Sequence, residues 1–494
     1  MNRQLYDLED KFAPFAHKMT QAGLPDLAQC AFRRHYEQLV LGHQGYITNA
    51  EARPVHDLPV MDELRTYTGD GAKALARAVV IKLNGGLGAT MGLAGPKSLL
   101  VAKNGYTFLE IIVEQVRRVR QQTGVRLPII FMNSFHTHAA TQAALSAMPD
   151  LPYEAPFCFE QHRIPKVWRD DLTPVRWPSD PQKEWCPPGH GDFYLAIQSS
   201  GLLERLLARG YEYAIISNAD NLGAVVDLEI LGYFAARRLT FLMEVTRRTE
   251  NDRKGGHLAV NAHGHLLLRE VAQCPPAELP QFQNIGRYRF FNTNNLWIHL
   301  PSLRQILAQN GGILDLPLIR NVKPVDPQQP DSPKVYQLET AIGAAIGLLP
   351  NVQAVVTPRP RFLPVKNTNH LLALWSDAYV LGDDFGVIPN PHRNLPGEPI
   401  IDLDPRYFRF VEQLRAHFPK GAPSLLRCNR LSIRGNVFVD RTVDLEGDVL
   451  IEHLDDDPIY LSSASARSGR ARSPSAPDLS TPATQKRAVS TARR

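Results

Sequence analysis

The sequence predicts an α/β protein whose central sheet is largely parallel. Short apolar runs alternate with segments in which apolar residues recur every three or four positions, the pattern of strands alternating with helices. The first such run, residues 78–83, leads directly into a glycine-rich stretch, as a strand leads into a loop. Sheets of this kind bind ligands beyond the carboxyl ends of their strands, so we expect the functional residues in the loops that follow them.

The elements follow in chain order from these patterns. Residues 1–75 predict an N-terminal helical extension, because apolar positions around 27–41 and 61–66 keep helical spacing. Thr107 is expected to cap a helix whose apolar face begins at Phe108. The other expected elements are strands at 78–83, 127–132, 211–217, 239–245 and 296–299 and helices at 137–147 and 202–209.

The pattern changes near the C-terminus. Residues 431–452 alternate apolar and polar residues with glycines at the turns, which predicts a small β-solenoid. After Tyr460 the chain is mostly Ser, Ala, Arg, Pro and Thr, which predicts a disordered tail. The expected parts are a helical extension, a central α/β domain, a linker with the β-solenoid, and a basic tail, at residues 1–75, 76–385, 386–456 and 457–494.

The basic charge of the chain is concentrated in that tail. The 494 residues include 55 Lys and Arg and 50 Asp and Glu, a formal charge of +5. Residues 461–494 hold seven basic side chains and one acidic one, a net +6, which leaves −1 for everything before them. The tail has no aromatic residue that could stack on bases, so no specific nucleic-acid partner is expected.

Cysteine usage and hydropathy indicate the compartment. The five cysteines form no CxxC pair, which is typical of free thiols in a reducing environment. The chain starts without a signal-peptide pattern and has no run of ~18 apolar residues. We therefore expect a cytoplasmic protein with no membrane partner.

The strongest chemical signal is the loop at residues 83–98, Leu-Asn-Gly-Gly-Leu-Gly-Ala-Thr-Met-Gly-Leu-Ala-Gly-Pro-Lys-Ser. Glycines let the backbone approach a ligand closely, successive N–H groups can converge on phosphate oxygens, and Lys97 adds a full positive charge. A dinucleotide-binding loop would have glycine at Met91, and a P-loop would have glycine at Pro96. The loop predicts phosphate binding of another kind.

The loop resembles the signature of the eukaryotic-type UTP–glucose-1-phosphate uridylyltransferases, or UDP-glucose pyrophosphorylases. Ala89 departs from that signature, which usually has threonine there, so one hydroxyl near the phosphates is missing. We expect phosphate binding to be changed by this rather than lost. Further family-like segments follow in order: Asn133-Ser-Phe-His-Thr-His138, Phe159-Glu-Gln-His-Arg-Ile-Pro165, Pro187-Pro-Gly-His-Gly-Asp192, Ser217-Asn-Ala-Asp-Asn-Leu-Gly223, Lys254-Gly-Gly256, Glu270-Val-Ala-Gln273, Phe291-Asn-Thr-Asn-Asn-Leu-Trp297, Leu338-Glu-Thr-Ala-Ile-Gly343 and Arg361-Phe-Leu-Pro-Val-Lys366.

The resemblance implies a fold and an activity. The fold would be a nucleotidyltransferase Rossmann-like (GT-A-like) central domain with a C-terminal left-handed β-helix, through which family members can self-associate. The reaction would be reversible transfer of a uridylyl group from UTP to glucose 1-phosphate, with Mg²⁺ as cofactor and pyrophosphate as the second product.

Residue roles come from the same resemblance. Lys97 and Lys366 would be catalytic, and Asp220 would bind the metal, although an Asp after a strand can also merely cap the next helix. The nucleotide would be bound by Leu83, Asn84, Gly85, Gly86, Lys97, Gln161, Gly189 and Asp220. Glucose 1-phosphate would be bound by His190, Asn218, Gly256, Glu270, Asn294 and Lys366.

Two alternative functions stay open. One is the same chemistry on another sugar, by a UDP-sugar or a UDP-N-acetylhexosamine pyrophosphorylase. The N-acetylhexosamine enzymes have Gln and Arg where this chain has Leu87 and Thr90, which favours glucose. The other is a nucleotide-binding pseudoenzyme, and the joint presence of Lys97, Asp220 and Lys366 argues against it. The pairs His136/His138 and His263/His265 are interpreted as structural, because no third zinc ligand lies at suitable spacing.

Overall fold

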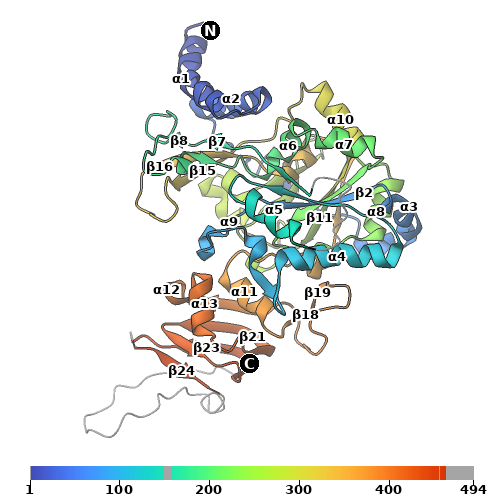
Figure 1. The fold of residues 1–494 in the computed structure, drawn as a ribbon, viewed down its shortest axis with the longest axis vertical. Coiled ribbons are helices and arrows are strands. Elements are labelled where there is room, and N and C mark those ends of the chain that lie inside the picture. The colour runs from blue at the N-terminus through green and yellow to red at the C-terminus, as the bar shows by residue number, and fades with distance from the viewer. Residues whose placement is uncertain (1, 149–156, 456, 463–494) are drawn as a thin grey trace. The chain divides into compact units, whose positions relative to one another are not determined.

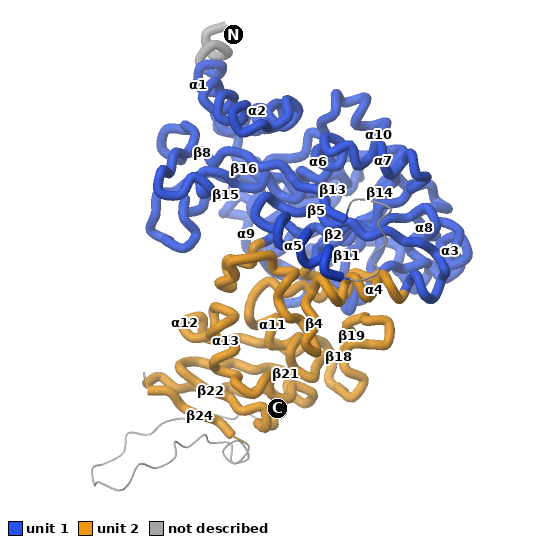
Figure 2. Tube along the Cα trace, in the orientation of Figure 1, with its two compact units in different colours: residues 1–86, 119–219, 226–362 blue, residues 87–118, 220–225, 363–494 orange. Residues whose placement is uncertain are grey.

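The computed structural model describes residues 2–148, 157–455 and 457–462, with side chains from residue 8 onward (Figure 1). The chain divides into two compact units, coloured separately in Figure 2. Unit 1 comprises residues 1–86, 119–219 and 226–362, and unit 2 comprises residues 87–118, 220–225 and 363–494. The chain therefore passes between the units three times within segments that the sequence marks as functional, after Gly86, after Ala219 and after Phe362.

Unit 1 is built on a ten-stranded mixed sheet. Its strands are β1 (Arg53–Pro54), β2 (Ala78–Asn84), β5 (Ile129–Asn133), β6 (Cys158–Glu160), β10 (Tyr213–Asn218), β11 (Phe241–Arg247), β12 (His257–Val260), β13 (Leu266–Arg269), β14 (Phe290–His299) and β17 (Val352–Val356). Smaller sheets contain β7 (Ile164–Pro165), β8 (Val167–Trp168), β9 (Trp185–Cys186), β15 (Ile319–Pro324) and β16 (Lys334–Glu339). Its helices are α1 (Asn2–Gln21), α2 (Asp26–Val40), α3 (Thr68–Leu75), α5 (His138–Ser146), α6 (Phe193–Ser199), α7 (Leu202–Ala208), α8 (Leu228–Ala236), α9 (Leu279–Phe282) and α10 (Leu300–Gln309).

The prediction of a largely parallel sheet is confirmed for one half of it only. Strands β10, β2, β5 and β6 are neighbours in parallel, and β11 pairs with β17 in parallel. Strand β14 runs antiparallel to β10, β11 and β12, so the sheet is mixed. An apolar run reveals a buried strand but not its direction, which depends on the connection the chain makes.

The core of unit 1 forms because β2 is buried along its whole length. Alternate residues of a strand point to opposite faces, and Val79, Ile81 and Leu83 join the cluster that includes apolar residues of α6, α7 and α10. The opposite face carries Lys82, whose Nζ donates to Ser217 Oγ on β10 at 2.7 Å. Burial lowers the pKa of Lys82 to about 7.

The N-terminal part confirms the expected helices and adds a strand. Helix α2 covers most of 27–41, and a 3₁₀ helix, Met61–Tyr67, stands at 61–66. Between them, within the part expected to be helical, β1 pairs with β12 in the main sheet. Residues 2–86 therefore contribute to the sheet of unit 1 as well as to its surface.

Unit 2 contains α4 (Phe108–Thr123, which ends in unit 1) and a series of short elements. Thr107 caps α4 as predicted, since its Oγ1 accepts from the Glu110 N–H at 3.2 Å and donates to Glu110 Oε2 at 2.8 Å. The other elements are β3 (Val101–Lys103), β4 (Tyr106–Thr107), α11 (Thr368–Trp375), β18 (Tyr379–Leu381), β19 (Val387–Pro389), β20 (Ile400–Leu403), α12 (Pro405–Phe408), α13 (Val411–His417), β21 (Ser424–Arg434), β22 (Val437–Val439), β23 (Asp444–Glu452) and β24 (Ile459–Leu461).

The C-terminal strands pair in parallel, in the orders β20-β21-β23 and β22-β24. Strand β24 lies inside residues 457–494, which the sequence assigned to the tail, so this part of the prediction is wrong. Ile459 to Leu461 are paired with β22, and Leu461 is buried. The rest of the predicted tail, residues 463–494, lies outside the described residues. Within the described part of the chain, no helix is long and apolar enough to cross a membrane.

Candidate active site

Only the first four residues of the glycine-rich loop, 83–86, belong to unit 1, where a dense set of hydrogen bonds holds the end of β2. Asn84 Nδ2 donates to Asn133 Oδ1 at 2.8 Å and to Thr141 Oγ1 at 2.9 Å, and the Asn84 carbonyl accepts from Thr137 Oγ1 at 2.8 Å. Asn84 is 3% exposed, so its amide acts mainly by fixing the direction in which the chain leaves the strand. Leu83 is buried in the core and can serve a ligand only through its backbone.

Gly85 lies against Gln161, the residue expected to read uracil. A Cβ on Gly85 would stand 2.4 Å from Gln161 Nε2, so only glycine allows this approach. The Gly85 carbonyl accepts from Ser134 Oγ at 2.9 Å. A Cβ on Gly86, by contrast, would meet nothing within 4 Å. The structure therefore brings together Gly85 and Gln161 and leaves open space beside Gly86.

The bend at Gly189 and His190 is held by the chain that follows β16. Gly189 has φ +80°, and a Cβ there would stand 2.4 Å from the Thr340 carbonyl oxygen. His190 Nδ1 accepts the Ile342 N–H at 3.0 Å, and burial lowers the pKa of His190 to about 4. The ring is therefore neutral at pH 7 and carries its proton on Nε2, which makes His190 a hydrogen-bond donor to a ligand.

Asn218, the last residue of β10, lies next to Asn294, which is within β14. Asn294 Nδ2 donates to Asn218 Oδ1 at 2.9 Å. Asn294 has φ +59° and is 6% exposed, and its Oδ1 is buried without a hydrogen-bond partner among the described residues. Such an acceptor costs free energy unless a ligand donates to it. Gly256 and Glu270 are also together, since a Cβ on Gly256 would stand 2.5 Å from Glu270 Oε1.

Apart from Glu270, the charged candidates belong to unit 2. Lys97 Nζ donates to Asp220 Oδ2 at 2.6 Å, with side chains 14% and 22% exposed. The Asp220 carbonyl accepts the Val365 N–H at 3.2 Å. Val365 directly precedes Lys366, so the backbone of Lys366 lies close to that of Asp220. Asn221 Oδ1 accepts the Leu363 N–H at 2.8 Å and ties the same two segments together. The structure thus gathers Lys97, Asp220 and the backbone of Lys366.

Asp220 has the properties of a magnesium ligand. Its Oδ2 is paired with Lys97, whereas its Oδ1 is buried and has no hydrogen-bond partner among the described residues. No three His, Cys, Asp or Glu side chains in the described ranges are grouped to hold a metal by themselves. Mg²⁺ commonly takes one or two carboxylates together with substrate phosphates, so a single free carboxylate oxygen fits this ion when a nucleotide is bound.

Sequence reasoning missed the residues that position these groups. Ser134, Thr137, Thr340 and Asn221 each hold a backbone group of the site, and all four lie in segments that resemble the family. Small polar residues after a strand are a weak signal, because they also occur in ordinary turns. Their roles become visible only when a partner far along the chain is known.

Comparison with known proteins identifies the family of this chain. A model of the family described as UTP–glucose-1-phosphate uridylyltransferase matches residues 29–446. The chain belongs to this family. A probable UTP–glucose-1-phosphate uridylyltransferase of Schizosaccharomyces pombe is 39% identical over 457 residues, 92% of this chain and 88% of that protein. The potato (Solanum tuberosum) UTP–glucose-1-phosphate uridylyltransferase is 39% identical over 394 residues, 79% of this chain and 80% of that protein.

Solved structures of UDP-glucose pyrophosphorylases share the α/β fold of this uridylyltransferase family member. A structure described as UDP-glucose phosphorylase from Trypanosoma brucei superposes with a TM-score of 0.87 at 42% identity, covering 92% of this chain and 97% of that one. A G45Y mutant of the Leishmania major UDP-glucose pyrophosphorylase, in complex with UDP-glucose, superposes with a TM-score of 0.86 at 40% identity and the same coverage. The family and the α/β fold expected from the sequence are confirmed.

Proposed function

We propose that this protein converts UTP and glucose 1-phosphate to UDP-glucose and pyrophosphate, reversibly and with Mg²⁺. The observation that carries the proposal is the group formed by Lys97, Asp220 and the Lys366 segment, in a chain whose loop and family match nucleotide–sugar synthesis. Two lysines and a carboxylate with one free oxygen are what two phosphate-bearing reactants need. The curated relatives named for this reaction support the same choice.

The reaction requires charge neutralisation more than a covalent nucleophile. An oxygen of glucose 1-phosphate attacks the α-phosphorus of UTP in line, and pyrophosphate leaves with the electrons of the broken P–O bond. Two unit charges ~4 Å apart contribute about 4 kcal/mol at an effective dielectric of ~20, so each placed cation matters. Lys97 would act on the departing phosphates and Lys366 on the transferring group.

Magnesium would be held by Asp220 Oδ1 and the nucleotide phosphates, and when bound it would neutralise phosphate charge. Asp220 Oδ2 holds Lys97, so the same carboxylate would fix the lysine beside the metal. Phosphate oxygens would compete with Asp220 for Lys97 Nζ when the nucleotide enters. The ion pair therefore holds Lys97 beside the position in which it would bind the phosphates.

Recognition falls to groups of unit 1, most of them neutral. Gln161 can donate to and accept from the uracil edge, and it lies against Gly85 of the loop. His190 would donate from Nε2 to a phosphate oxygen. Asn294 Oδ1, buried and unpaired among the described residues, would accept from a glucose hydroxyl, with Asn218, Gly256 and Glu270 beside the sugar.

The test is pyrophosphate release from UTP with glucose 1-phosphate, galactose 1-phosphate or N-acetylglucosamine 1-phosphate, each with Mg²⁺ and with EDTA. We expect release with glucose 1-phosphate to be at least about tenfold faster than with the other two, and EDTA to abolish it. Fastest release with another sugar would establish the broader or N-acetylhexosamine function. Binding of UTP without release from any of the three would establish a pseudoenzyme.

Two further features are proposed with this function. The parallel pairing of β20-β21-β23 and β22-β24 is compatible with a left-handed β-helix, which we propose as the C-terminal fold and as a surface for self-association. A cytoplasmic location follows from the sequence pattern alone. Sedimentation of the full chain and of a chain ending before β21 would test the role in self-association.

A further inference from the structure

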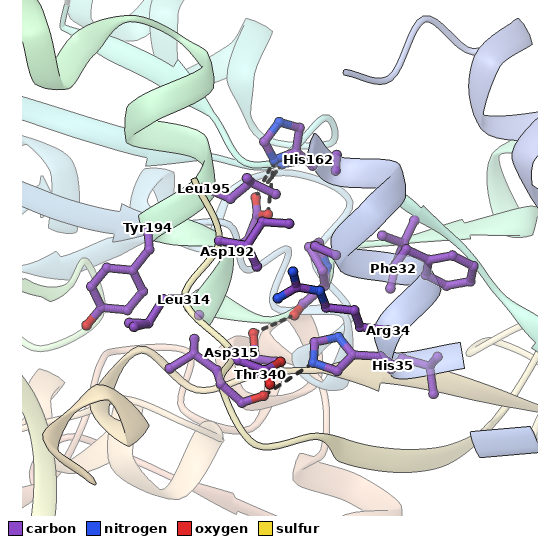
Figure 3. Close-up of a pocket in the computed structure, with 18 residues that line it drawn as sticks. Phe32, Arg34, His35, His162, Asp192, Tyr194, Leu195, Leu314, Asp315 and Thr340 are labelled. Carbon is purple, nitrogen blue, oxygen red and sulfur yellow. Dashed lines mark hydrogen bonds and ion pairs between the residues drawn. The ribbon is translucent and has the colours of Figure 1, made fainter. Parts of the chain in front are cut away.

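A second group of chemically reactive side chains lies in unit 1, outside the residues assigned to uridylyl transfer. His162 Nδ1 stands 3.0 Å from both carboxylate oxygens of Asp192, and Asp192 Oδ2 also accepts the His162 backbone N–H at 2.6 Å. On the other side of the ring, Ser199 Oγ stands 3.0 Å from His162 Nε2. Figure 3 shows His162 and Asp192 joined at the edge of a small cavity.

The hydrogen bonds define the proton positions. A carboxylate only accepts, so His162 Nδ1 carries a proton and the neutral ring has its lone pair on Nε2. When the ring is neutral, the Ser199 hydroxyl donates to Nε2. Its alternative acceptor, the Ala196 carbonyl, is farther away at 3.4 Å. A hydroxyl, an imidazole acceptor and an orienting carboxylate in this sequence form the arrangement that activates a serine nucleophile.

Solvent exposure increases from Asp192 through His162 to Ser199, as a reactive serine with a buried base requires. The Asp192 and His162 side chains are only 5% and 11% exposed, which keeps the carboxylate and the ring in place. Ser199 ends α6 and is exposed, so a reagent can reach its oxygen from solvent. The following N–H groups are already used, since Ser200 donates to Ala196 O at 3.0 Å and Gly201 donates to Gln198 O at 2.9 Å. They do not supply an oxyanion hole.

We propose that Ser199 is an activated nucleophile that accepts an acyl group from reactive carboxylic esters, independently of uridylyl transfer. Ser199 Oγ attacks the ester carbonyl carbon, the C–O bond to the leaving group breaks, and the leaving alkoxide departs with the bonding electrons. The Oγ proton passes to His162 Nε2 and then to the leaving group or to water. Because Ser200 and Gly201 supply no donors for the oxyanion, acylation is confined to reactive esters, and the less reactive serine ester is hydrolysed more slowly than it forms, so the acyl-enzyme accumulates.

The experiment uses the full chain and p-nitrophenyl acetate. We expect a burst of about one equivalent of nitrophenolate per chain, followed by little steady release, and peptide mapping should find the acetyl group on Ser199. Ser199→Ala should lose the burst and keep uridylyl transfer. Ser200→Ala is the matched control and should keep both, because the hydrogen bonds of Ser200 Oγ within the described part of the chain are those to the Ile197 carbonyl and from the Leu202 N–H, each at 3.4 Å.

The dependence on the imidazole separates an activated serine from an ordinary surface serine. His162→Gln should slow acetylation of Ser199 roughly 10²-fold or more, the usual contribution of a positioned general base. Acetylation of Ser199 no faster than that of Ser200, or at an unchanged rate in His162→Gln, would overturn the proposal. Because uridylyl transfer is measured on the same samples, that outcome would leave the proposed main function untouched.

Discussion

The candidate site residues of the two units differ in charge. In unit 1 they are mostly neutral and buried: Gln161, Asn294 and a His190 whose pKa burial lowers to about 4. In unit 2 the side chains of Lys97, Asp220 and Lys366 are charged, and Lys97 and Asp220 keep some exposure. Neutral donors and acceptors distinguish hydroxyl and amide patterns, whereas charges stabilise phosphates wherever they meet them. The difference assigns selectivity to unit 1 and rate to unit 2.

The largest effect is expected at Lys366. Lys366→Ala should lower kcat roughly 10²- to 10³-fold, because it removes a cation from the transferring phosphate while leaving the fold unchanged. Steady-state kinetics and a thermal melt measure both. Lys420→Ala is a matched control within unit 2, since Lys420 is an exposed lysine paired with Asp440. Near-normal kcat in Lys366→Ala would remove Lys366 from the mechanism.

Asp220→Asn is next. The substitution keeps the shape of the side chain but removes the charge that holds Lys97 and would hold Mg²⁺. We expect kcat to fall roughly 10²-fold and the Mg²⁺ titration to move to higher concentration. Asp440→Asn, at the exposed pair with Lys420, should leave both unchanged. An unaltered Mg²⁺ titration in Asp220→Asn would count against the metal-ligand role.

In unit 1, Asn294→Asp should change binding rather than rate. Aspartate tolerates the positive φ of this position, but it cannot donate to Asn218 and it places a negative charge where the sugar phosphate would bind. We expect KM for glucose 1-phosphate to rise roughly 10- to 100-fold, the loss of about 1–3 kcal/mol, with kcat within a few-fold.

The neighbouring Asn295 is the control for that variant. Asn295 Nδ2 donates to Glu244 Oε2 at 3.3 Å and to the Arg361 carbonyl at 3.1 Å, so it supports the buried ion pair in which Arg361 Nε lies 2.7 Å from Glu244 Oε2. Asn295→Ala should lower the melting temperature with little change in KM. If the two variants behaved alike, Asn294 would have a structural role only.

A smaller effect is expected at Gly92 in the second half of the loop. Gly92 has φ +77°, and a Cβ there would stand 2.9 Å from Phe410 Cδ1. Gly92→Ala should raise KM for UTP several-fold, since strain of about 1–2 kcal/mol displaces the loop. Gly95→Ala, with nothing within 4 Å and no positive φ, is the control. In the double variant with Phe410→Ala, KM for UTP should fall part of the way back. If KM did not fall, backbone strain at residue 92 alone would account for the effect.

The smallest effect concerns acid stability of unit 1. Burial, with Arg248 and Arg269 nearby, lowers the pKa of His257, so the folded state stays unprotonated while the unfolded chain takes up a proton below pH ~6.5. Stability therefore falls as pH falls below that value, by up to about 1.4 kcal/mol per pH unit for this group. Urea unfolding at pH 7.5 and 5.5 should show a smaller loss in His257→Leu than in His263→Ala, an exposed control. Equal losses would contradict the assignment.

The sequence predicted some of these features and not others. The glycines and Lys97 were singled out by their own pattern, a long glycine-rich loop with a lysine, whereas the role of Asp220 came from the family resemblance. The antiparallel β14, the pairing of β24 and the positioning contacts of Thr340 and Asn221 could not be predicted, because each depends on a partner distant in the chain. The Ser199–His162–Asp192 group was missed for the same reason, since its members are spread over residues 162–199.

The most direct test of the account is to follow labelled phosphorus from UTP with glucose 1-phosphate and Mg²⁺. Label at the α-phosphorus should appear in UDP-glucose, and label at the γ-phosphorus should appear in pyrophosphate, in equal amounts. That result would show that the bond broken is the one between the α-phosphorus and pyrophosphate, as transfer of the uridylyl group requires. Label from the γ-phosphorus in free phosphate, or no transfer of the α-label, would contradict it.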